Sequence, residues 1–513
     1  LTVSETCVSD AVDRGITVTE MALMGESIDV SPETTAAFVG RALRGPLNEP
    51  VLVHDFGEFR RRFGDSWSRS SLGPAVRQFF DHGGRQLYVV RVANGARGAM
   101  LCLPASGSAL VLRAVEPGST EQIRAAVDYD GVDETDDALF NLTLQRIDPA
   151  SGHVIDQETY RRASYREEDG SFIGDSLLTS SLARIAQPHP NHRPEPTPIS
   201  GAALRPGYAE KVQEGADGHE LTDYDLVGSR RAGTGIFALD TLSRLDLVYL
   251  PPPGKNRDLG PASLLAAELF CRERGAMLIA DPQSGWVTPA KAIDGVRRLG
   301  LASPNAMTYF PRMYQRDGDG SARTIGGAIA GRLCKQDRLA SGPAPDAGLA
   351  LSRDLVAAFN VEPDDVPALE REGLNPIING AAGRARLLPS VTLRGGGETQ
   401  RQFADLGARR VCLRVVNSID LGTRWALFES DGERVERRVR AQIEAYLAAL
   451  ASIGALASER YSVDCEVTHR GLTIVVGFQP PGCAAPVSFT LHQGAAGCRV
   501  TATAFAPVMQ NCA

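Results

Sequence analysis

The arrangement of apolar and polar residues near the start of the chain predicts a strand, two helices and a second strand. Apolar residues run together at 35–40 and at 87–92, which predicts strands. Between them, residues 54–63 and 73–80 repeat apolar side chains at helical spacing. Pro74 stands near the first turn of the second helix, where its missing N–H costs little. This order predicts parallel or mixed strand pairing.

A different pattern follows over residues 99–200 and predicts a small all-β insertion. Its short alternating runs lie at 109–115, 123–129 and 140–147. The acidic run at 128–137 is interpreted as a solvated loop, because the spaced ligands and closing glutamate of an EF-hand are missing. The proline-rich stretch at 187–198 is interpreted as a linker, with His189 and His192 as exposed spacers rather than metal ligands.

Strand–helix alternation resumes near residue 230 and predicts an α/β sheet with helical crossovers. The predicted strands are 245–250, 276–280 and 306–310. The predicted helices are 264–274, 289–299 and 324–335. The last helix contains Gly326, Gly327 and Gly331, which predicts close packing against a neighbouring element.

The last block, 374–481, predicts several strands and one long helix. The predicted strands are 388–393, 411–416, 424–428, 461–467 and 472–478. The predicted helix is 433–450, where apolar residues recur every three or four positions and form a core stripe.

Four arginines crowd the first turns of this helix: Arg434, Arg437, Arg438 and Arg440. Cations near a helix N-terminus oppose the macrodipole, at roughly 0.3–1 kcal/mol each. One interpretation is a solvated face that neighbouring glutamates partly balance. The other is that the arginines meet an acidic partner, for which Arg437 and Arg440 share one side and Arg434 extends the row.

Composition narrows the function classes. The net charge of −8 argues against a nucleic-acid-binding protein, which usually carries a basic face. No apolar run reaches the roughly 18 residues of a membrane span, and the first residues do not resemble a signal peptide. The nine cysteines are scattered and predict reduced, mostly buried thiols. A disulfide or metal trio of Cys483, Cys498 and Cys512 is the less favoured alternative, because metal-ligand spacings are tighter.

No catalytic, cofactor-binding or metal-ligating motif is found. The sequence has no Gly-x-Ser-x-Gly elbow, and the glycine-rich stretch 394–399 lacks the lysine of a phosphate-binding loop. Asp281 follows a predicted strand, where an open sheet can place a ligand, but Asp281-Pro282 is better interpreted as a turn. Asp225 and Asp337 are interpreted as capping or buried carboxylates. An α/β enzyme of unknown reaction remains the alternative function.

Several blocks resemble, in the same order, motifs of the contractile tail sheath family. The closest are TTAAFVGRALRGPLNEPVLVHDFGEFRRRFG at 34–64, GPAVRQFFDHGGRQLYVVRV at 73–92 and TRWALFESDGERVERRVRAQIEAYLAALASIGAL at 423–456. GADG at 215–218 and LNPII at 374–378 are similar to two further motifs. The blocks together cover most of residues 15–492.

The resemblance implies a multidomain α/β and α+β fold with terminal arms. Its expected parts are an N-terminal extended arm (1–33), a first part of the α/β core (34–98), an inserted outer β domain (99–200), a second part of the α/β domain (201–373), a C-terminal α+β domain that faces a tube (374–485) and a C-terminal arm (486–513). The α/β domain is expected to have subtilisin-like topology without a protease triad.

The resemblance also implies a structural function. The chain is expected to polymerise as stacked hexameric rings into a helical sheath, which contracts to drive an inner tube through a target envelope. Further expected partners are baseplate and terminator proteins, with no direct nucleic-acid contact, no membrane insertion and no cofactor. Assembly is expected in the bacterial cytoplasm, as part of a phage tail or a phage-like injection particle.

Two groups of residues are predicted to make the contacts between proteins. Strands that link subunits are predicted at Gly15, Ile16, Thr17, Val18, Thr19, Glu20 and Met21, and at Val487, Ser488, Phe489, Thr490, Leu491 and His492. Both alternate at period two and are expected to pair with strands of other subunits. The helix row predicted to contact the tube is Arg434, Arg437 and Arg440.

Overall fold

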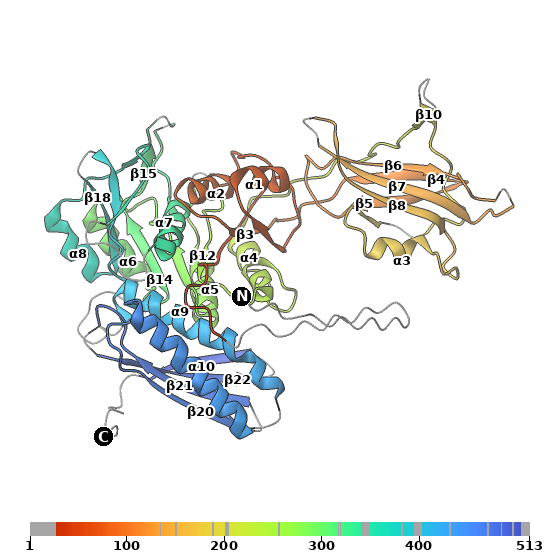
Figure 1. Ribbon diagram of the computed structural model, residues 1–513. Coiled ribbons are helices and arrows are strands. Elements are labelled where there is room, and N and C mark those ends of the chain that lie inside the picture. The colour runs from red at the N-terminus through yellow and green to blue at the C-terminus, as the bar shows by residue number, and fades with distance from the viewer. Residues whose placement is uncertain are drawn as a thin grey trace, which may run out of the picture.

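A computed structural model describes the chain from residue 27 to residue 503, with short gaps. The gaps are 134, 149–150, 187–188, 201–204, 255–256, 317, 319, 340–347, 381–382, 394–402, 430–431, 469–470, 484 and 495–496. The described residues form a central α/β domain, a β domain set to one side of it, and a C-terminal domain that packs below the central one (Figure 1).

A nine-stranded sheet forms the middle of the central domain. Its strands, in spatial order, are β16 (Leu349–Ala350), β19 (Ala385–Leu387), β18 (Leu374–Asn379), β14 (Ala306–Phe310), β13 (Met277–Ala280), β12 (Leu247–Tyr249), β1 (Ala36–Gly40), β3 (Leu87–Arg91) and β2 (Pro50–Val53). The six strands from β18 to β3 pair in parallel with one another. The pairings of β16 with β19, β19 with β18 and β2 with β3 are antiparallel. Strands β1, β12, β13 and β14 are buried throughout, which explains their continuous apolar runs.

Helices cover both faces of this sheet. One face carries α1 (Phe56–Phe63), α2 (Leu72–Asp81) and α7 (Gly326–Leu339). The other carries α4 (Asp223–Val227), η1 (Gly235–Thr241), α5 (Pro261–Arg274), α6 (Pro289–Leu299) and α8 (Val366–Arg371), which follows η2 (Pro363–Asp365). A Cβ on Gly327 would lie 2.1 Å from the Ala75 carbonyl oxygen, so the predicted close packing of the glycine-rich helix is found between α7 and α2.

The order of the parallel strands in the sheet is that of a doubly wound fold. Strand β1 lies between β3, which follows it in the chain, and β12, from which β13, β14 and β18 continue outward. The chain therefore reverses its direction of winding at β1. The more specific subtilisin-like topology stays a prediction. A small antiparallel pair, β15 (Met313–Gln315) with β17 (Leu355–Ala357), lies outside the large sheet.

The predicted β insertion is confirmed as two three-stranded sheets around one core. One sheet contains β4 (Met100–Ala105), β5 (Ser108–Ala114) and β9 (Ala183–Ile185); the other contains β6 (Ile123–Asp128), β7 (Leu139–Ile147) and β8 (Val154–Ser164). Helix α3 (Ile173–Leu178) covers them, and β10 (Ile199–Ser200) pairs with β11 (Arg205–Pro206).

The proline-rich stretch is packed onto the insertion and does not act as a free linker. The Pro194 carbonyl accepts a hydrogen bond from Tyr129 Oη at 2.8 Å, and the Thr197 amide donates to the Val127 carbonyl. His189 packs against Phe172 with 4.5 Å between ring centroids, so its interpretation as an exposed spacer is wrong. Among the described residues, no cluster of histidine, cysteine or carboxylate side chains is arranged to hold a metal.

The C-terminal domain packs two helices on one face of a four-stranded antiparallel sheet. The helices are α9 (Leu406–Thr423), which continues into η5 (Arg424–Phe428), and α10 (Gly432–Ser452). The strands are β20 (Ser462–Thr468), β21 (Gly471–Phe478), β22 (Val487–Gly494) and β23 (Gly497–Thr503). Alternate side chains of β21 and β22 enter the core beside the apolar stripe of α10, which confirms the predicted long helix.

Three predicted strands in this block are wrong. Residues 411–416 lie within α9, where Val415, Val416 and Ile419 form part of a buried apolar stripe. Asp405 caps the start of this helix by accepting a hydrogen bond from the Ala408 amide. Local β-branched residues suggested a strand, but burial against the sheet decides the structure. Residues 424–428 form η5. Of 388–393, only Val391 makes an isolated bridge, because Pro389 interrupts the strand.

Candidate interaction surfaces

In the C-terminal sheet, both edges of β22 pair with strands of the same chain. Residues Leu472–Phe478 pair with β22 on one side and β23 pairs on the other. The expectation that Val487–His492 is unpaired within its own subunit is therefore wrong, and the expected arm boundary at 486 falls inside a sheet. Two alternating strands follow one another with a short turn, and they satisfy each other's backbone groups locally. Among the described strands, β20 and β23 each pair on one side only.

The first predicted linking strand, Gly15–Met21, lies outside the described residues. The described chain begins beside the C-terminal domain, where Ile28 is buried in the core of α9 and α10. A Cβ on Gly422 would lie 2.6 Å from Ile28 Cγ1, so this glycine permits the contact. From there the chain runs to β1, and the Thr35 amide donates to Asp246 Oδ2 at 2.8 Å.

The arginine row of α10 is exposed, and one member is tied to the sheet. Arg440 Nη2 lies 2.9 Å from Asp464 Oδ1 on β20, with both side chains largely exposed. Within the described residues, Arg437 Nε donates to the Glu433 carbonyl of its own helix, at 3.4 Å. Arg434 is exposed on the same helix. The charge of Arg440 is thus balanced from β20 and not by the helix glutamates considered in the sequence.

Two further charged residues of this helix, Arg438 and Glu436, contact the rest of the domain. Arg438 lies over the Trp425 ring, 4.3 Å from its centroid, and is half-buried. Glu436 Oε1 accepts a hydrogen bond from the Val467 amide at 2.8 Å.

The three carboxylates considered for chemistry have structural partners. Asp225 completes a capping box with Thr222 at the start of α4. Asp337 accepts hydrogen bonds from Thr34 Oγ1 at 2.6 Å and from Arg410 Nη2 at 2.5 Å, and joins α7 to α9. Both agree with the capping or buried interpretation.

Asp281 follows β13 at the carboxyl edge of the sheet. It accepts a hydrogen bond from Tyr249 Oη at 2.6 Å. Desolvation raises the pKa of its carboxyl group to about 7, although the Tyr249 hydrogen bond and the Arg312 charge oppose the rise. Burial also raises the pKa of Tyr249 well above its ordinary value, so the tyrosine is a hydrogen-bond donor here and not a base.

A buried ionic network, which sequence reasoning missed, fixes the insertion to the central domain. Arg91, at the end of β3, donates to the carbonyls of Ala42 at 3.0 Å, Gly45 at 2.6 Å and Pro117 at 2.7 Å. Burial lowers the pKa of its guanidinium to about 10, against the attraction of nearby carboxylates. The only signal in the sequence is an arginine at the end of a buried apolar run.

The carboxylates of this network, Glu116 and Glu121, lie between β5 and β6 of the insertion. Glu116 Oε2 accepts from the Gly45 amide at 2.9 Å, and Glu116 Oε1 lies 3.4 Å from Arg146 Nη2. Arg146 Nε also donates to Glu121 Oε1 at 2.8 Å. The Glu116 contact with Gly45 therefore joins the insertion to the central domain through buried groups.

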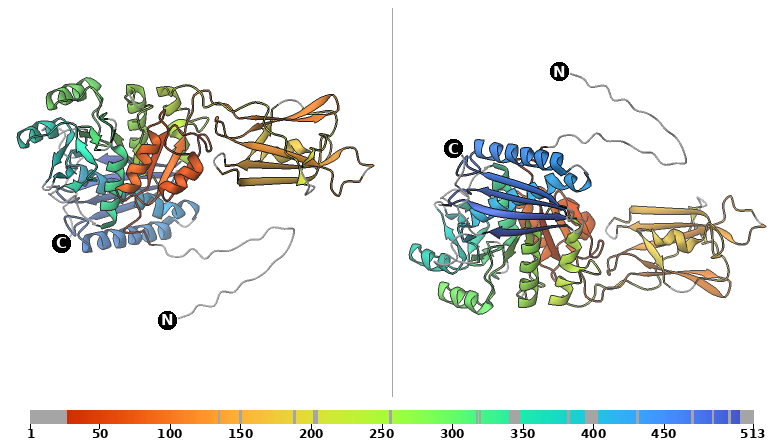
Figure 2. Two further views of the ribbon diagram at one scale, coloured as in Figure 1. Left: turned by 90° about the horizontal axis from the view of Figure 1, so that it is seen from above. Right: turned by 90° about the horizontal axis from the view of Figure 1, so that it is seen from below.

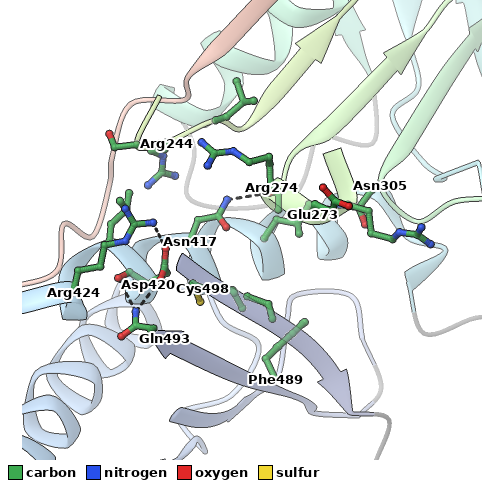
Figure 3. A pocket seen from close by; sticks show the side chains of 18 of the residues that line it. Arg244, Glu273, Arg274, Asn305, Asn417, Asp420, Arg424, Phe489, Gln493 and Cys498 are labelled. Atoms are coloured by element: carbon green, nitrogen blue, oxygen red, sulfur yellow. Dashed lines mark hydrogen bonds and ion pairs between the residues drawn. The ribbon is translucent and has the colours of Figure 1, made fainter. Parts of the chain in front are cut away.

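A groove of about 1410 Å³ lies between the central and C-terminal domains (Figure 3). One wall is formed by the face of α9 that carries Leu413, Asn417 and Asp420, and the floor includes Phe489 of the C-terminal sheet. The opposite wall comes from the start of β12 and the end of α5. Phe428 of η5 also lines the groove, and 90% of its surface is exposed.

Positive charge dominates this groove. It is lined by five arginines, Arg244, Arg272, Arg274, Arg409 and Arg424, and by two carboxylates, Glu273 and Asp420. Arg244 forms an ion pair with Asp246, and Arg424 Nη2 lies 2.6 Å from Asp420 Oδ2.

Arg274 lies half-buried at the end of α5. It donates to the Leu242 carbonyl, whereas its buried Nε has no hydrogen-bond partner in the described part of the chain. Burial lowers the pKa of its guanidinium; the Asp240 carboxylate opposes this shift and the Arg424 charge adds to it. An anionic group would therefore be stabilised in the groove.

Cys483 and Cys498 are free thiols, and Cys512 lies outside the described residues. The glycine-rich stretch 394–399 also lies outside them. Within the described ranges, no helix is long and apolar enough to cross a membrane.

Comparison of the sequence with protein-family models and with curated proteins gave no match. Solved structures gave matches over nearly the whole chain. A sheath tail protein of Listeria innocua shares 13% identity, with a TM-score of 0.62, over 91% of this chain and 96% of its own. A sheath tail protein of Desulfitobacterium hafniense shares 13% identity, with a TM-score of 0.52, over 94% and 100%.

A third similar structure is the PVC sheath complex of an extracellular contractile injection system in the contracted state. It shares 14% identity, with a TM-score of 0.51, over 93% of this chain and 96% of its own. All three comparisons span the central domain, the insertion and the C-terminal domain in one alignment. The chain therefore has the fold of contractile tail sheath proteins.

Proposed function

We propose that this chain is a non-enzymatic subunit that polymerises into a helical contractile sheath around an inner tube. The observation that carries this proposal is the match over more than nine-tenths of the chain to structures described as sheath proteins. The match includes the insertion and the C-terminal domain, which a shared α/β core alone would not require.

Assembly is the first property to test. Negative-stain microscopy of the purified protein should show rings or tubes at high concentration and compact monomers on dilution. Monomers at every concentration, with and without an inner tube, would contradict the proposal. ATP should not change the tubes, because contraction in this proposal is a shift between two packings of rigid subunits, with the energy stored during assembly.

The N-terminal segment is proposed to link subunits in the assembled sheath. Gly15–Met21 would add as a strand to a neighbouring sheet, with backbone hydrogen bonds that survive movement of the rest of the subunit. The open edges of β20 and β23 are acceptors of the required kind. This pairing gives a connection that does not depend on the surfaces that separate during contraction.

The exposed row Arg434, Arg437 and Arg440 is proposed to contact the tube. Guanidinium groups form forked, directional hydrogen bonds with carboxylates. Exposed pairs contribute only about 0–1 kcal/mol each, so many identical contacts would hold the tube while still allowing release.

The wider machine would include an inner tube, a baseplate and a terminator, assembled in the bacterial cytoplasm as a phage tail or phage-like particle. The proposed action is contraction that drives the tube through a target envelope. The similar solved structures include both tail sheath proteins and an injection-system sheath, and the proposal does not favour one machine over the other.

A further inference from the structure

The groove between the central and C-terminal domains has a lining that is both positively charged and partly apolar. It combines a nearly fully exposed aromatic ring, Phe428, with a surplus of arginines. An exposed aromatic side chain beside apolar neighbours marks a contact surface. The groove therefore suits a segment that is both acidic and partly apolar.

Residues 1–26 have this composition. They contain five carboxylates, from Glu5, Asp10, Asp13, Glu20 and Glu26, against the single basic residue Arg14. Apolar residues alternate with polar ones around Ile16 and Val18. Residues 504–513, AFAPVMQNCA, are the other terminal segment, and they carry no charged side chain. Charge complementarity therefore favours the N-terminal segment.

The described chain begins near the groove, at the end of α9. Ile28 packs on Gly422 of α9, whose neighbour Leu421 and nearby Arg424 line the groove. In Figure 3 the N-terminal ribbon passes beside Arg244 on the same side as Arg424. Five residues separate Met21 from Ser27, and they span at most about 20 Å when extended. The 15–21 stretch therefore starts within reach of this surface.

We propose that, in the unassembled subunit, residues 1–26 fold back into the groove of their own chain. A segment tethered at the rim has an effective concentration in the millimolar range, so it fills its own groove before a second copy can do so at micromolar protein concentration. The carboxylates face Arg272, Arg274 and Arg424, and the apolar residues cover Phe428. The segment proposed to link subunits is thereby withheld until assembly begins.

The test uses the full-length protein at a concentration where sedimentation shows only monomers. A photo-reactive residue, Val18→p-benzoylphenylalanine, is cross-linked in a mixture of ¹⁵N-labelled and unlabelled protein, and the linked peptides are identified by mass spectrometry. The expected links join position 18 to residues 413–428 or 489–500, with both peptides carrying the same isotope. The double variant Arg272→Glu, Arg424→Glu should reduce these links at least tenfold, and Arg61→Glu, an exposed arginine on α1, should not.

Three outcomes overturn the proposal: links between differently labelled chains, links to the edge of β20 in place of the groove, or links that survive the double variant. Phe428→Ala is the second variant, because its exposed ring makes no contribution to the core that folding needs, and it should also reduce the links. Since the measurement is made on monomers, its failure leaves the sheath proposal intact, and a failure to form tubes leaves this result intact.

Discussion

Arg440 on α10 and Asp464 on β20 form an exposed ion pair, with 2.9 Å between Nη2 and Oδ1. The pair makes Arg440 a partner of the sheet as well as a member of the proposed tube-facing row. Arg437 has only a long hydrogen bond to its own helix, so its guanidinium is the freer of the two to meet another protein.

The double variant Arg437→Glu, Arg440→Glu should fold and form sheath-like polymers but fail to retain the tube. Charge reversal replaces attraction to tube carboxylates with repulsion, and new repulsion from Asp464 should cost roughly 0.5 kcal/mol of stability. Co-purification of the tube is the measurement, and wild-type retention should weaken in high salt. Arg437→Glu alone should already weaken retention. Unchanged retention by the double variant would assign the row to a solvated face.

Deletion of residues 1–22 should leave a folded monomer and abolish assembly. Every core cluster lies within the described residues that follow, and Ile28 keeps its place against α9. Circular dichroism should therefore show the same secondary structure as the full-length protein, and thermal unfolding should differ only by the groove contact proposed above for residues 1–26. Long tubes formed by the truncated protein would show that the segment is dispensable.

Asp281→Asn should increase stability at neutral pH more than at acid pH. The folded-state pKa of this carboxyl is raised to about 7 from an ordinary value of 3.8. The folded protein therefore binds the proton more tightly than the unfolded chain, and wild-type stability falls as pH rises from about 4 to about 7. The difference between variant and wild type should grow across this window, on the order of 1–3 kcal/mol, and stay constant above it.

Urea unfolding at several pH values measures this difference. Tyr249→Phe provides the control, because it removes the hydroxyl that donates to Asp281 and should move the window to higher pH. A difference between Asp281→Asn and wild type that does not depend on pH would show that the carboxyl keeps an ordinary pKa.

Arg91→Met should destabilise the protein by about 3 kcal/mol or more, because it leaves several buried carbonyls without their hydrogen-bond donor and removes a positive charge near Glu116. Glu116→Gln should reduce stability by less, since the side-chain oxygen of glutamine can still accept a hydrogen bond from the Gly45 backbone N–H. Chemical denaturation would measure both, with Arg77→Met, an exposed helical arginine, as the control. A loss below 1 kcal/mol for Arg91→Met would show that the network does not fix the insertion.

The sequence was informative where one element carries its own periodic pattern. Strands β1, β3, β13 and β14, helices α2, α6 and α10, and the β character of the insertion were all predictable. Helix α9 was not, because its valines also fit a strand and only its packing against β22 decides between them. Nothing local in Val487–His492 distinguishes a strand that pairs within its chain from one that pairs outside it.

The groove and the Arg91 network were beyond sequence reasoning for a different reason. Each is assembled from residues more than a hundred positions apart, such as Arg274 with Asn417, or from one buried arginine that contacts carbonyls of several loops. Backbone carbonyls have no sequence signature. Whether a groove has a net positive charge depends on which carboxylates the fold brings next to its arginines.

The open edges of the C-terminal sheet belong to two different strands, β20 and β23, because β22 lies between its chain neighbours (Figure 2). If one of these edge strands paired with the same edge strand of a second copy, the contact would be identical on both partners and would produce only a two-fold dimer. A segment from elsewhere in the chain that adds to one edge makes a head-to-tail contact, which leaves the same edge free on the next copy. Such contacts close into rings or continue as helices, so the position of β22 is compatible with unlimited growth in one direction.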